Sequence, residues 1–288
     1  MCGRFAVTID PALLAEKIGA INETAPTPAP DDADAADGAS TTAATATAGY
    51  PTDGSPGAGT PVSYTPVNYN VAPTTPIATV VARHAVPEDD PTRRVRLMRW
   101  GLVPPWAKAG PGGTPQTRLL INARADTATS SPAFRASART RRCLVPMDGW
   151  YEWSAEPPTV VHGRAHKTSK TPFYLHRTDG EPLLVAGLWS VWRAGATAAP
   201  LLSCTILTTD AVGELAQIHP RMPLPVAEAD WDAWLDPDRP ADTALLSRPP
   251  DVRGIAVREV STLVNNVANN GPELIAPPGP QPGQLTLL

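Results

Sequence analysis

The feature that most limits how this chain can fold is a long stretch, from about residue 22 to residue 66, built mainly from Ala, Thr, Pro, Gly, Ser and Asp. It holds no Leu, Phe or Trp and shows no apolar periodicity. Such a segment cannot bury enough apolar surface to offset its ordering entropy, so we expect it to be disordered. We interpret it as an insertion that loops out of one domain rather than as a linker, because any chemistry near the N-terminus needs partners from later in the chain.

The remaining sequence predicts many short strands and a few helices. Asp10 and Pro11 are typical of the N-cap and first position of a helix that ends at Gly19, and Ser131 with Pro132 predicts the same start for a helix over 133–139. This mixture indicates an α+β fold with a curved antiparallel sheet, followed by a loose Pro/Gly-rich tail at 277–288. Strands are expected at 4–7, 76–81, 95–100, 143–146, 172–176, 183–189, 201–207 and 255–260, and further helices at 210–217 and 228–235.

Cysteine usage and hydropathy favour a soluble cytoplasmic protein. The three cysteines are too few for a disulfide framework and form no CxxC pair, a pattern typical of a reducing compartment. The N-terminus has no apolar signal-peptide region, and no apolar run approaches the ~20 residues of a membrane span. We therefore expect no membrane partner.

The positive charges are unevenly distributed along a chain whose net charge is −4. No Lys or Arg lies between Lys17 and Arg83, whereas twelve lie from Arg83 to Arg142, against four acidic residues. Such an excess can line a phosphate-binding groove, or it can form an ordinary solvated face, and charge alone leaves both interpretations open.

Cys2 is the first candidate for chemistry. If Met1 is removed, its α-amine and thiol form a 1,2-aminothiol, and unperturbed pKa values of about 8 and about 8.5 make both nucleophiles partly available near neutral pH. The alternative is that Cys2 is an ordinary small apolar residue near a frayed terminus.

Three later residues have types suited to catalysis. Asn122 lies at the end of an apolar run, Glu152 lies between two aromatic residues whose burial would raise its pKa, and His219 lies at the end of a predicted helix. Each also has a structural alternative: Glu152 could pair with an arginine, and His219 could interact with a helix dipole. Spacing alone does not bring these groups to Cys2.

Other polar or reactive residues favour no cofactor. His162 and His166 are four residues apart, but Gly163 and nearby basic residues indicate a loop with no accompanying carboxylate, so we expect no metal site. Cys143 and Cys204 lie in apolar strand patterns and are expected to be inert core thiols.

Eight ordered motifs resemble those of the SOS-response-associated peptidase (SRAP) family. They cover essentially the whole chain except the insertion and the tail, so the resemblance is specific. It implies a single SRAP-like domain over 1–276 with a barrel-like antiparallel core flanked by short helices. The motifs are Met1–Phe5, Tyr69–Thr74, Trp100–Pro104, Asn122–Arg124, Arg142–Pro146, Trp150–Trp153, Ala186–Trp189 and His219–Pro223.

The resemblance implies a monomer that binds single-stranded DNA containing an abasic site, in the cytoplasm with the nucleoid. The amine of mature Cys2 would add to the sugar aldehyde and form an imine, and its thiol would close a five-membered thiazolidine, a DNA–protein crosslink that protects the lesion in the DNA damage response. Both nucleophiles come from one residue, so ring closure is intramolecular. Lyase and autopeptidase activities are also implied.

The same resemblance assigns roles to individual residues. Glu152 resembles the family's acid–base, His219 the histidine that assists sugar ring opening and crosslink formation or reversal, and Asn122 the residue that orients Cys2 and the sugar. The expected DNA-binding residues are Gly3, Arg4, Arg124, Thr208, Trp100 and Trp106; for the two tryptophans, base stacking and core packing are equally open.

The chain departs from the family pattern in its long insertion and in Thr75, which stands where the family often has glutamine. Two other functions remain open: a thiol autopeptidase that acts first on the Met1–Cys2 bond, and a non-covalent single-strand-binding module that uses the basic block and the tryptophans.

Overall fold

The computed structural model describes residues 2–24, 64–155, 160–161, 164–165 and 170–278, and five of its strands close into a small barrel. Neighbours in the order β5-β4-β9-β14-β15 are antiparallel, and the barrel closes because β15 also pairs with β5 in parallel. The α+β class with a curved, barrel-like core is confirmed. The barrel strands are β4 (Pro76–Arg83), β5 (Thr92–Trp100), β9 (Arg142–Met147), β14 (Leu183–Trp192) and β15 (Leu201–Asp210).

Short strands extend the barrel at two places. β2 pairs in parallel with β5, whereas β8 and β16 both pair with β15. Two small hairpins, β6 with β7 and β11 with β12, form sheets of their own. These strands are β2 (Ile21–Asn22), β6 (Lys108–Ala109), β7 (Pro115–Gln116), β8 (Asn122–Arg124), β11 (Val160–Val161), β12 (Arg164–Ala165) and β16 (Arg221–Pro223).

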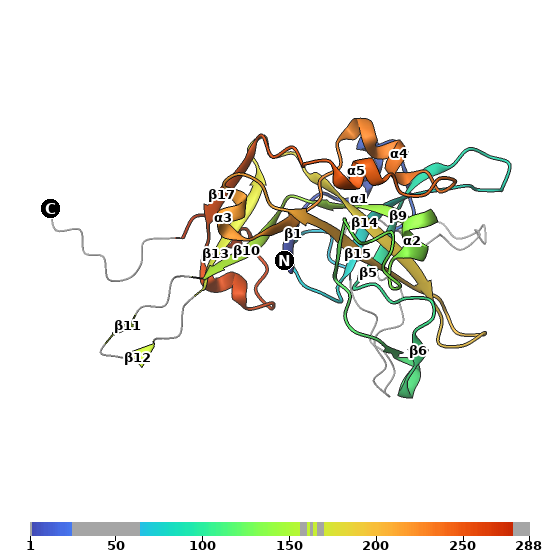
Figure 1. Cartoon of the computed structure of the whole chain (residues 1–288), viewed down its shortest axis with the longest axis horizontal. Coiled ribbons are helices and arrows are strands. Elements are labelled where there is room, and N and C mark those ends of the chain that lie inside the picture. Colours follow the sequence, from blue (N-terminus) through green and yellow to red (C-terminus); the bar gives the residue numbers. More distant parts are fainter. Residues whose placement is uncertain (1, 25–63, 156–159, 162–163, 166–169, 279–288) are drawn as a thin grey trace, which may run out of the picture.

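A second sheet of five strands lies beside the barrel, in the order β17-β13-β10-β1-β3. In Figure 1, β1 lies between the part of the molecule that carries β10, β13 and β17 and the part that carries β14, β15 and β5. This position brings the residues around β1 against both sheets. The strands are β1 (Arg4–Val7), β3 (Asn68–Val71), β10 (Gly149–Ala155), β13 (Lys170–Arg177) and β17 (Ile255–Glu259).

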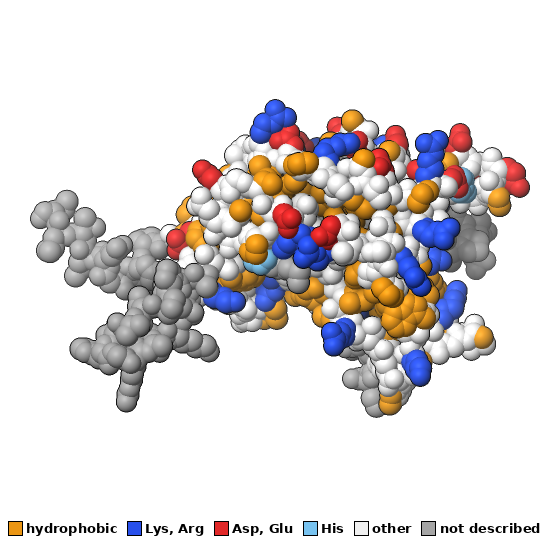
Figure 2. Space-filling model, viewed as in Figure 1, with side chains coloured by type: hydrophobic (Ala, Val, Ile, Leu, Met, Phe, Trp, Pro, Cys, Tyr) orange, Lys and Arg blue, Asp and Glu red, His pale blue; other side chains and the backbone are white. Residues whose placement is uncertain are grey.

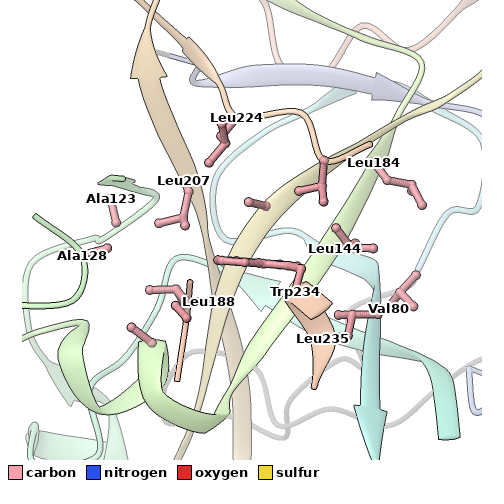
Figure 3. Packing of buried hydrophobic residues seen from close by; sticks show 14 of the residues in the cluster. Val80, Ala123, Ala128, Leu144, Leu184, Leu188, Leu207, Leu224, Trp234 and Leu235 are labelled. Atoms are coloured by element: carbon pink, nitrogen blue, oxygen red, sulfur yellow. The ribbon is translucent and has the colours of Figure 1, made fainter. Parts of the chain in front are cut away.

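The outer face of the barrel is covered by helices. Trp234 of α4 (Trp231–Leu235) lies among leucines of β9, β14 and β15 (Figure 3), and its indole N–H donates to the Cys143 carbonyl at 2.8 Å. α1 (Pro11–Lys17) and α5 (Thr243–Ser247) contribute to the same cluster of buried residues.

The inner face of the barrel forms a second core that continues into the five-stranded sheet. Side chains alternate along a strand, so the residues that do not face the helices face the barrel interior. Phe5 of β1 packs edge-on against Trp100 of β5, with ring centroids 5.1 Å apart. Trp150 of β10 belongs to the same cluster, so this core connects the barrel to the five-stranded sheet next to β1.

Two predicted helices differ from the structure. The Ser131 carbonyl accepts from the Phe134 N–H and closes a tight turn, so α2 (Arg135–Thr140) begins later than Ala133. Asp210 ends β15, where it pairs with Arg221 of β16, so only α3 (Leu215–Ile218) remains of the helix expected over 210–217. Strand pairing across β15 outweighs the local helix-starting tendency of Asp210.

The first helix was predicted correctly, and single 3-10 turns complete the chain. The Asp10 carboxylate accepts from the Ala12 N–H at 2.7 Å and caps α1. The 3-10 turns are η1 (Pro111–Gly113), η2 (Glu228–Asp230), which precedes α4, η3 (Thr262–Asn265) and η4 (Pro272–Leu274).

The insertion begins later in the chain than the sequence predicted, because Asn22 and Glu23 belong to the fold. Asn22 lies opposite Val95 in the β2–β5 ladder, and the Glu23 N–H donates to the Val95 carbonyl at 2.9 Å. Residues 25–63 lie outside the described residues, as do His162, His166 and residues 279–288 of the tail. Phe5 of β1 pairs with Val71 of β3, so the segments before and after the insertion belong to one sheet.

No helix in the described part of the chain is both long enough and apolar enough to span a membrane.

Candidate functional site

Cys2 is buried at the junction of the two sheets. β1 is held on one side by β10, with Phe5 opposite Trp150, and on the other by β3. Cys2 lies two residues before the first residue of this strand and is 0% exposed, with its thiol 3.8 Å from the Arg4 carbonyl. Cys2 is therefore an ordered core residue, and its burial by itself fits both a reactive residue and an ordinary small apolar one.

Asn122 holds the backbone of Cys2. β8 runs parallel to β15, with Asn122 opposite Ile206, and this pairing brings the Asn122 side chain to the start of β1. Its Nδ2 donates to the Cys2 carbonyl at 2.7 Å. Its Oδ1 is buried and accepts no hydrogen bond from any residue that the structure describes, so this acceptor is available for an amine or a substrate hydroxyl.

Glu152 is a buried carboxyl close enough to Cys2 to influence its thiol. It lies on β10, one residue beyond Tyr151, which pairs with Arg4, and is 3% exposed. Burial raises the pKa of Glu152 to about 7, although the positive charge of the chain's amino terminus acts in the opposite direction. An arginine partner would lower the pKa, so the direction of the shift favours an acid–base over a structural ion pair.

The same burial makes the Cys2 thiol weakly acidic. Desolvation raises the pKa of Cys2 well above its ordinary value, and the Glu152 carboxylate raises it further. The thiol is therefore protonated at neutral pH until a neighbouring base accepts its proton.

His219 follows α3, where Nδ1 lies 3.0 Å from both the backbone nitrogen and the carbonyl oxygen of Arg221. These contacts orient the ring. Desolvation lowers the pKa of His219, and the positive charges of the amino terminus, Arg221 and Lys170 lower it further. The ring is consequently uncharged at neutral pH, and it senses the same amino-terminal charge as Glu152. The structure thus brings Asn122 and Glu152 to Cys2, and the charge of the amino terminus acts on His219 as well as on Glu152.

Arg4 is engaged within the protein. Its guanidinium donates to Asn70 Oδ1 at 2.5 Å, to the Val264 carbonyl at 3.0 Å and to the Asn265 carbonyl at 3.4 Å. Asn70 in turn donates from Nδ2 to the carbonyls of Asn266 and Asn269, both at 3.0 Å. These bonds fasten β1 to the loop around η3 and so fix the strand that follows Cys2; the predicted phosphate contact of Arg4 stays a prediction.

Arg124 and Thr208 lie at the ends of neighbouring strands, opposite each other in the β8–β15 ladder. Arg124 is exposed and forms an ion pair with Asp126 at 2.6 Å, whereas Thr208 is fully buried and donates to the Ala123 carbonyl at 3.3 Å. Arg221 donates to the Thr208 carbonyl and to the Asp210 carboxylate, each at 2.5 Å. Arg124 is thus accessible to a ligand and Thr208 supports the strand. Gly3 is half-buried between Cys2 and Arg4.

Trp100 and Trp106 differ in their exposure to solvent. Trp100 is 0% exposed, packs on Phe5 and donates its indole N–H to the Ile121 carbonyl at 2.9 Å, so it belongs to the core and offers no ring face to a base. The base-stacking prediction is wrong for Trp100. Trp106 is 65% exposed. On the face seen in Figure 2, hydrophobic side chains gather at the lower right with Lys and Arg side chains around them.

The basic block does not form one uniform surface. Arg142 is buried and serves the fold, because its guanidinium donates to five backbone carbonyls, those of Trp234, Asp236, Arg239, Ala138 and Arg139. Arg93 pairs with Asp232 and Arg94 with Glu23. Only part of the positive charge counted in the sequence is therefore available to a ligand.

Two residues that sequence reasoning assigned no role position the site. Asn70 anchors Arg4, and Arg221 fixes both the His219 ring and the end of β15. Both lie inside the matched motifs Tyr69–Thr74 and His219–Pro223, so motif membership was the available signal, but their partners are far away in sequence. Among the described residues, no group of three or more His, Cys, Asp or Glu side chains is arranged to hold a metal ion.

Comparison with known proteins places this chain in a family. The family described as SOS response associated peptidase (SRAP) matches residues 1–267. Abasic site processing protein YoqW of Bacillus subtilis is 34% identical over 208 residues, covering 72% of this chain and 84% of YoqW. Abasic site processing protein HMCES of Xenopus tropicalis is 35% identical over 208 residues, covering 67% of this chain and 61% of HMCES.

Solved structures agree with the fold. A Bacteroides thetaiotaomicron protein superposes with a TM-score of 0.58 at 23% identity, covering 73% of this chain and 85% of its own. A phage-related protein of Bordetella bronchiseptica superposes with a TM-score of 0.55 at 25% identity, covering 90% and 94%. By sequence match and by fold, this chain is a member of the SRAP family.

Proposed function

We propose that this protein processes abasic sites in single-stranded DNA, as the names of its relatives suggest for those proteins, and that it does so by a covalent bond through Cys2. The observation that carries the proposal is the junction at Cys2: the residue is held by Asn122, lies beside a carboxyl whose pKa is about 7, and shares the amino-terminal region with a neutral histidine. A backbone nitrogen that becomes an amine when Met1 is removed, an acid–base and a thiol at one point suit carbonyl chemistry.

The reaction uses both nucleophiles of Cys2 after Met1 is removed. The α-amine adds to C1′ of the ring-opened sugar, and the carbinolamine loses water to give an imine. The thiol sulfur then bonds to the same carbon while its proton is transferred to the imine nitrogen, which closes the thiazolidine. The second step is intramolecular, and it removes the imine that would otherwise hydrolyse or permit β-elimination of the strand.

Glu152 supplies the proton transfers. With a pKa of about 7 the carboxyl is populated in both protonation states near neutral pH, so it can accept a proton from the attacking amine and return one to the departing water. It can also receive the thiol proton as the ring closes, which matters because the pKa of that thiol is raised. Neutral His219 is suited to assist the opening of the sugar ring.

The raised pKa of the thiol argues against the autopeptidase alternative. A thiol peptidase relies on a thiolate whose pKa is depressed by a nearby positive charge or a helix N-terminus. Burial and the Glu152 carboxylate act on Cys2 in the opposite direction. The thiol is better suited to a second addition, inside a pocket, to a carbon already held by the amine.

The direct test is an incubation of processed protein with single-stranded DNA that contains one abasic site, followed by a denaturing gel. A shifted band that survives heating supports the crosslink. Intact mass of the same sample reports whether Met1 has been removed, because a retained Met1 blocks the amine. A processed sample that gives no band would overturn the proposal.

Arg124→Ala is expected to weaken binding to lesion-free single-stranded DNA and to reduce the slope of log affinity against log salt by about 0.7, the value for one lost phosphate contact. Asp126→Asn is the matched variant, because it removes the ion-pair partner at 2.6 Å and leaves the guanidinium to the DNA. It should tighten binding. Fluorescence anisotropy over a salt series measures both, and an unchanged slope in Arg124→Ala would exclude the phosphate contact.

Trp106→Ala and Trp100→Ala are expected to change different properties, the affinity for DNA in the first and the stability of the fold in the second. Loss of the exposed Trp106 ring should reduce the affinity for single-stranded DNA by about 1–3 kcal/mol, the range for one stacked base, with little change in stability. Loss of the buried Trp100 ring should cost about 3–5 kcal/mol of unfolding free energy. Anisotropy and urea denaturation separate the two. Wild-type DNA affinity in Trp106→Ala would rule out its stacking role.

A further inference from the structure

A row of arginines lies at one mouth of the barrel, away from Cys2. In the β4–β9 ladder Val80 is opposite Leu144, so the same register brings Arg83 opposite Arg141. The backbone N–H of Trp189 donates to the Arg141 carbonyl at 2.9 Å, so Trp189 of β14 lies next to Arg141. Because side chains alternate, these three share the face that lines the barrel interior.

Arg83 and Arg141 both lie over the Trp189 ring. The distance from the guanidinium carbon to the ring centroid is 4.3 Å for Arg83 and 5.8 Å for Arg141. Arg96 comes from the same face of β5, and burial together with the charges of Arg141 and Arg96 lowers the pKa of Arg83. Arg83, Arg96 and Arg141 are called the arginine cluster below.

The protein itself supplies little negative charge to this cluster. Among the described residues, neither the Arg83 nor the Arg141 guanidinium has a hydrogen bond or ion pair, whereas Arg96 shares Glu23 with Arg94. One cation over the indole would give the cation–π contact and cover the ring. A second guanidinium adds repulsion without a protein partner, which is the arrangement expected of a site that receives an anion from outside.

An open groove of about 1010 Å³ leads to the cluster. Arg83, Arg94 and Arg96 line it, together with His84, and the acidic groups along it are Glu23 and Asp238, the second of which pairs with His84 at 3.0 Å. Three arginines line it against these two acidic residues, a balance of charge that suits an anionic ligand.

The groove lies away from the Cys2 junction. Arg141 immediately precedes β9, and Asp148 immediately follows it and donates its N–H to the Ala6 carbonyl of β1 at 2.8 Å. Seven residues of extended chain separate these two points, which corresponds to about 20 Å. The arginine cluster therefore lies at the opposite end of β9 from the contact with β1.

We propose that the arginine cluster is a second phosphate-binding site for single-stranded DNA, which holds the backbone of the strand whose lesion is bound at Cys2. The proposal rests on the proposed function for the identity of the polymer. Bidentate pairs between guanidinium groups and phosphates neutralise the positive charge of the cluster. This binding is independent of DNA sequence, because it contacts only the sugar–phosphate backbone.

The test compares long and short strands. The variant Arg83→Ala/Arg141→Ala should bind a long lesion-free strand about tenfold more weakly and with a salt slope shallower by about 1.4, the value for two lost phosphate contacts. Crosslinking of a short strand centred on an abasic site should be unchanged, because that strand does not reach the groove. Arg248→Ala/Arg253→Ala removes the same charge from exposed positions elsewhere and should keep the wild-type slope.

Failure of the second phosphate site and failure of the Cys2 chemistry would give different results. A wild-type slope and affinity for the long strand in the double variant would overturn the second site, whatever happens at Cys2. Failure of wild-type protein to crosslink would overturn only the Cys2 chemistry, because the lesion-free strand still reports phosphate binding. If the double variant does not fold, Arg141→Glu, a single change at a half-buried side chain, should give the same loss of affinity and slope. Equal loss in the Arg248→Ala/Arg253→Ala control would also contradict a local site.

Discussion

Replacement of Cys2 with serine is expected to abolish the heat-stable crosslink while leaving the first bond-forming step possible. Serine keeps the α-amine, and as a small residue it keeps Met1 removable, but it lacks the thiol that closes the ring. The amine should still form an imine with the sugar aldehyde. Borohydride reduction should trap this imine as a stable adduct, whereas without reduction the gel should show free protein and β-eliminated strand.

Two controls sharpen this result. Cys204→Ala removes another buried thiol from the same core cluster and should crosslink like wild type, although with lower stability. A sample in which Met1 is retained should not give the heat-stable crosslink, because its amine and thiol then belong to different residues and cannot close the five-membered ring. A heat-stable band from Cys2→Ser, equal in yield to that of wild type, would contradict the thiazolidine.

Glu152→Gln is expected to slow crosslinking by about 100-fold, the lower end of the range for loss of a general acid–base. The wild-type rate should change with an inflection near pH 7, where the Glu152 carboxyl titrates, and the variant should lack that inflection. Glutamine keeps the shape and the polar head, so the comparison isolates the proton. Single-turnover gel assays over a pH series measure it, and an identical inflection in the variant would assign the titration to another group.

The same substitution should also make the protein more stable relative to wild type as the pH rises. The folded-state pKa of Glu152 is raised from 4.5 to about 7, so the folded protein binds more protons than the unfolded chain between these values. The stabilising effect of the neutral carboxyl is complete below pH 4.5 and is lost as the pH rises to about 7. Relative to wild type, Glu152→Gln should therefore gain about 3 kcal/mol of unfolding free energy between these limits.

Urea denaturation of both proteins across that pH range measures the difference. Glu16→Gln removes one carboxyl from the exposed side of α1 and should run parallel to wild type. A difference between Glu152→Gln and wild type that did not change with pH would mean that the Glu152 carboxyl is not raised in the folded protein.

Much of the fold follows from local pattern. Alternation and β-branched residues located the barrel strands β4, β5, β9, β14 and β15, because a buried strand must present apolar residues wherever it packs. Prediction was weaker where a local signal competed with a distant partner. Asp210 has the chemistry of a helix N-cap, yet the Arg221 guanidinium and the β16 backbone keep it in a strand.

The candidate site was predictable in its members but not in its geometry. Motif order pointed to Cys2, Asn122, Glu152 and His219, which come from four separate parts of the chain. Nothing in their spacing indicates that Asn122 would bind the Cys2 carbonyl. Nor does the sequence indicate that Trp100 would be buried and Trp106, six residues later, exposed. The arginine cluster was hidden for the same reason, since Arg83, Arg96 and Arg141 meet only through the β4–β5 and β4–β9 pairings.

The sequence by itself determined the identity of the reactive groups: an aminothiol at position 2, an aromatic-flanked carboxyl, a histidine next to proline, and an excess of arginine in one segment. Tertiary structure alone decided their chemical state. Burial between the barrel and the five-stranded sheet raises the pKa values of Cys2 and Glu152 and lowers that of His219, because removing water disfavours whichever form is charged. The residue types are local properties of the chain, whereas desolvation and proximity exist only once distant strands have paired.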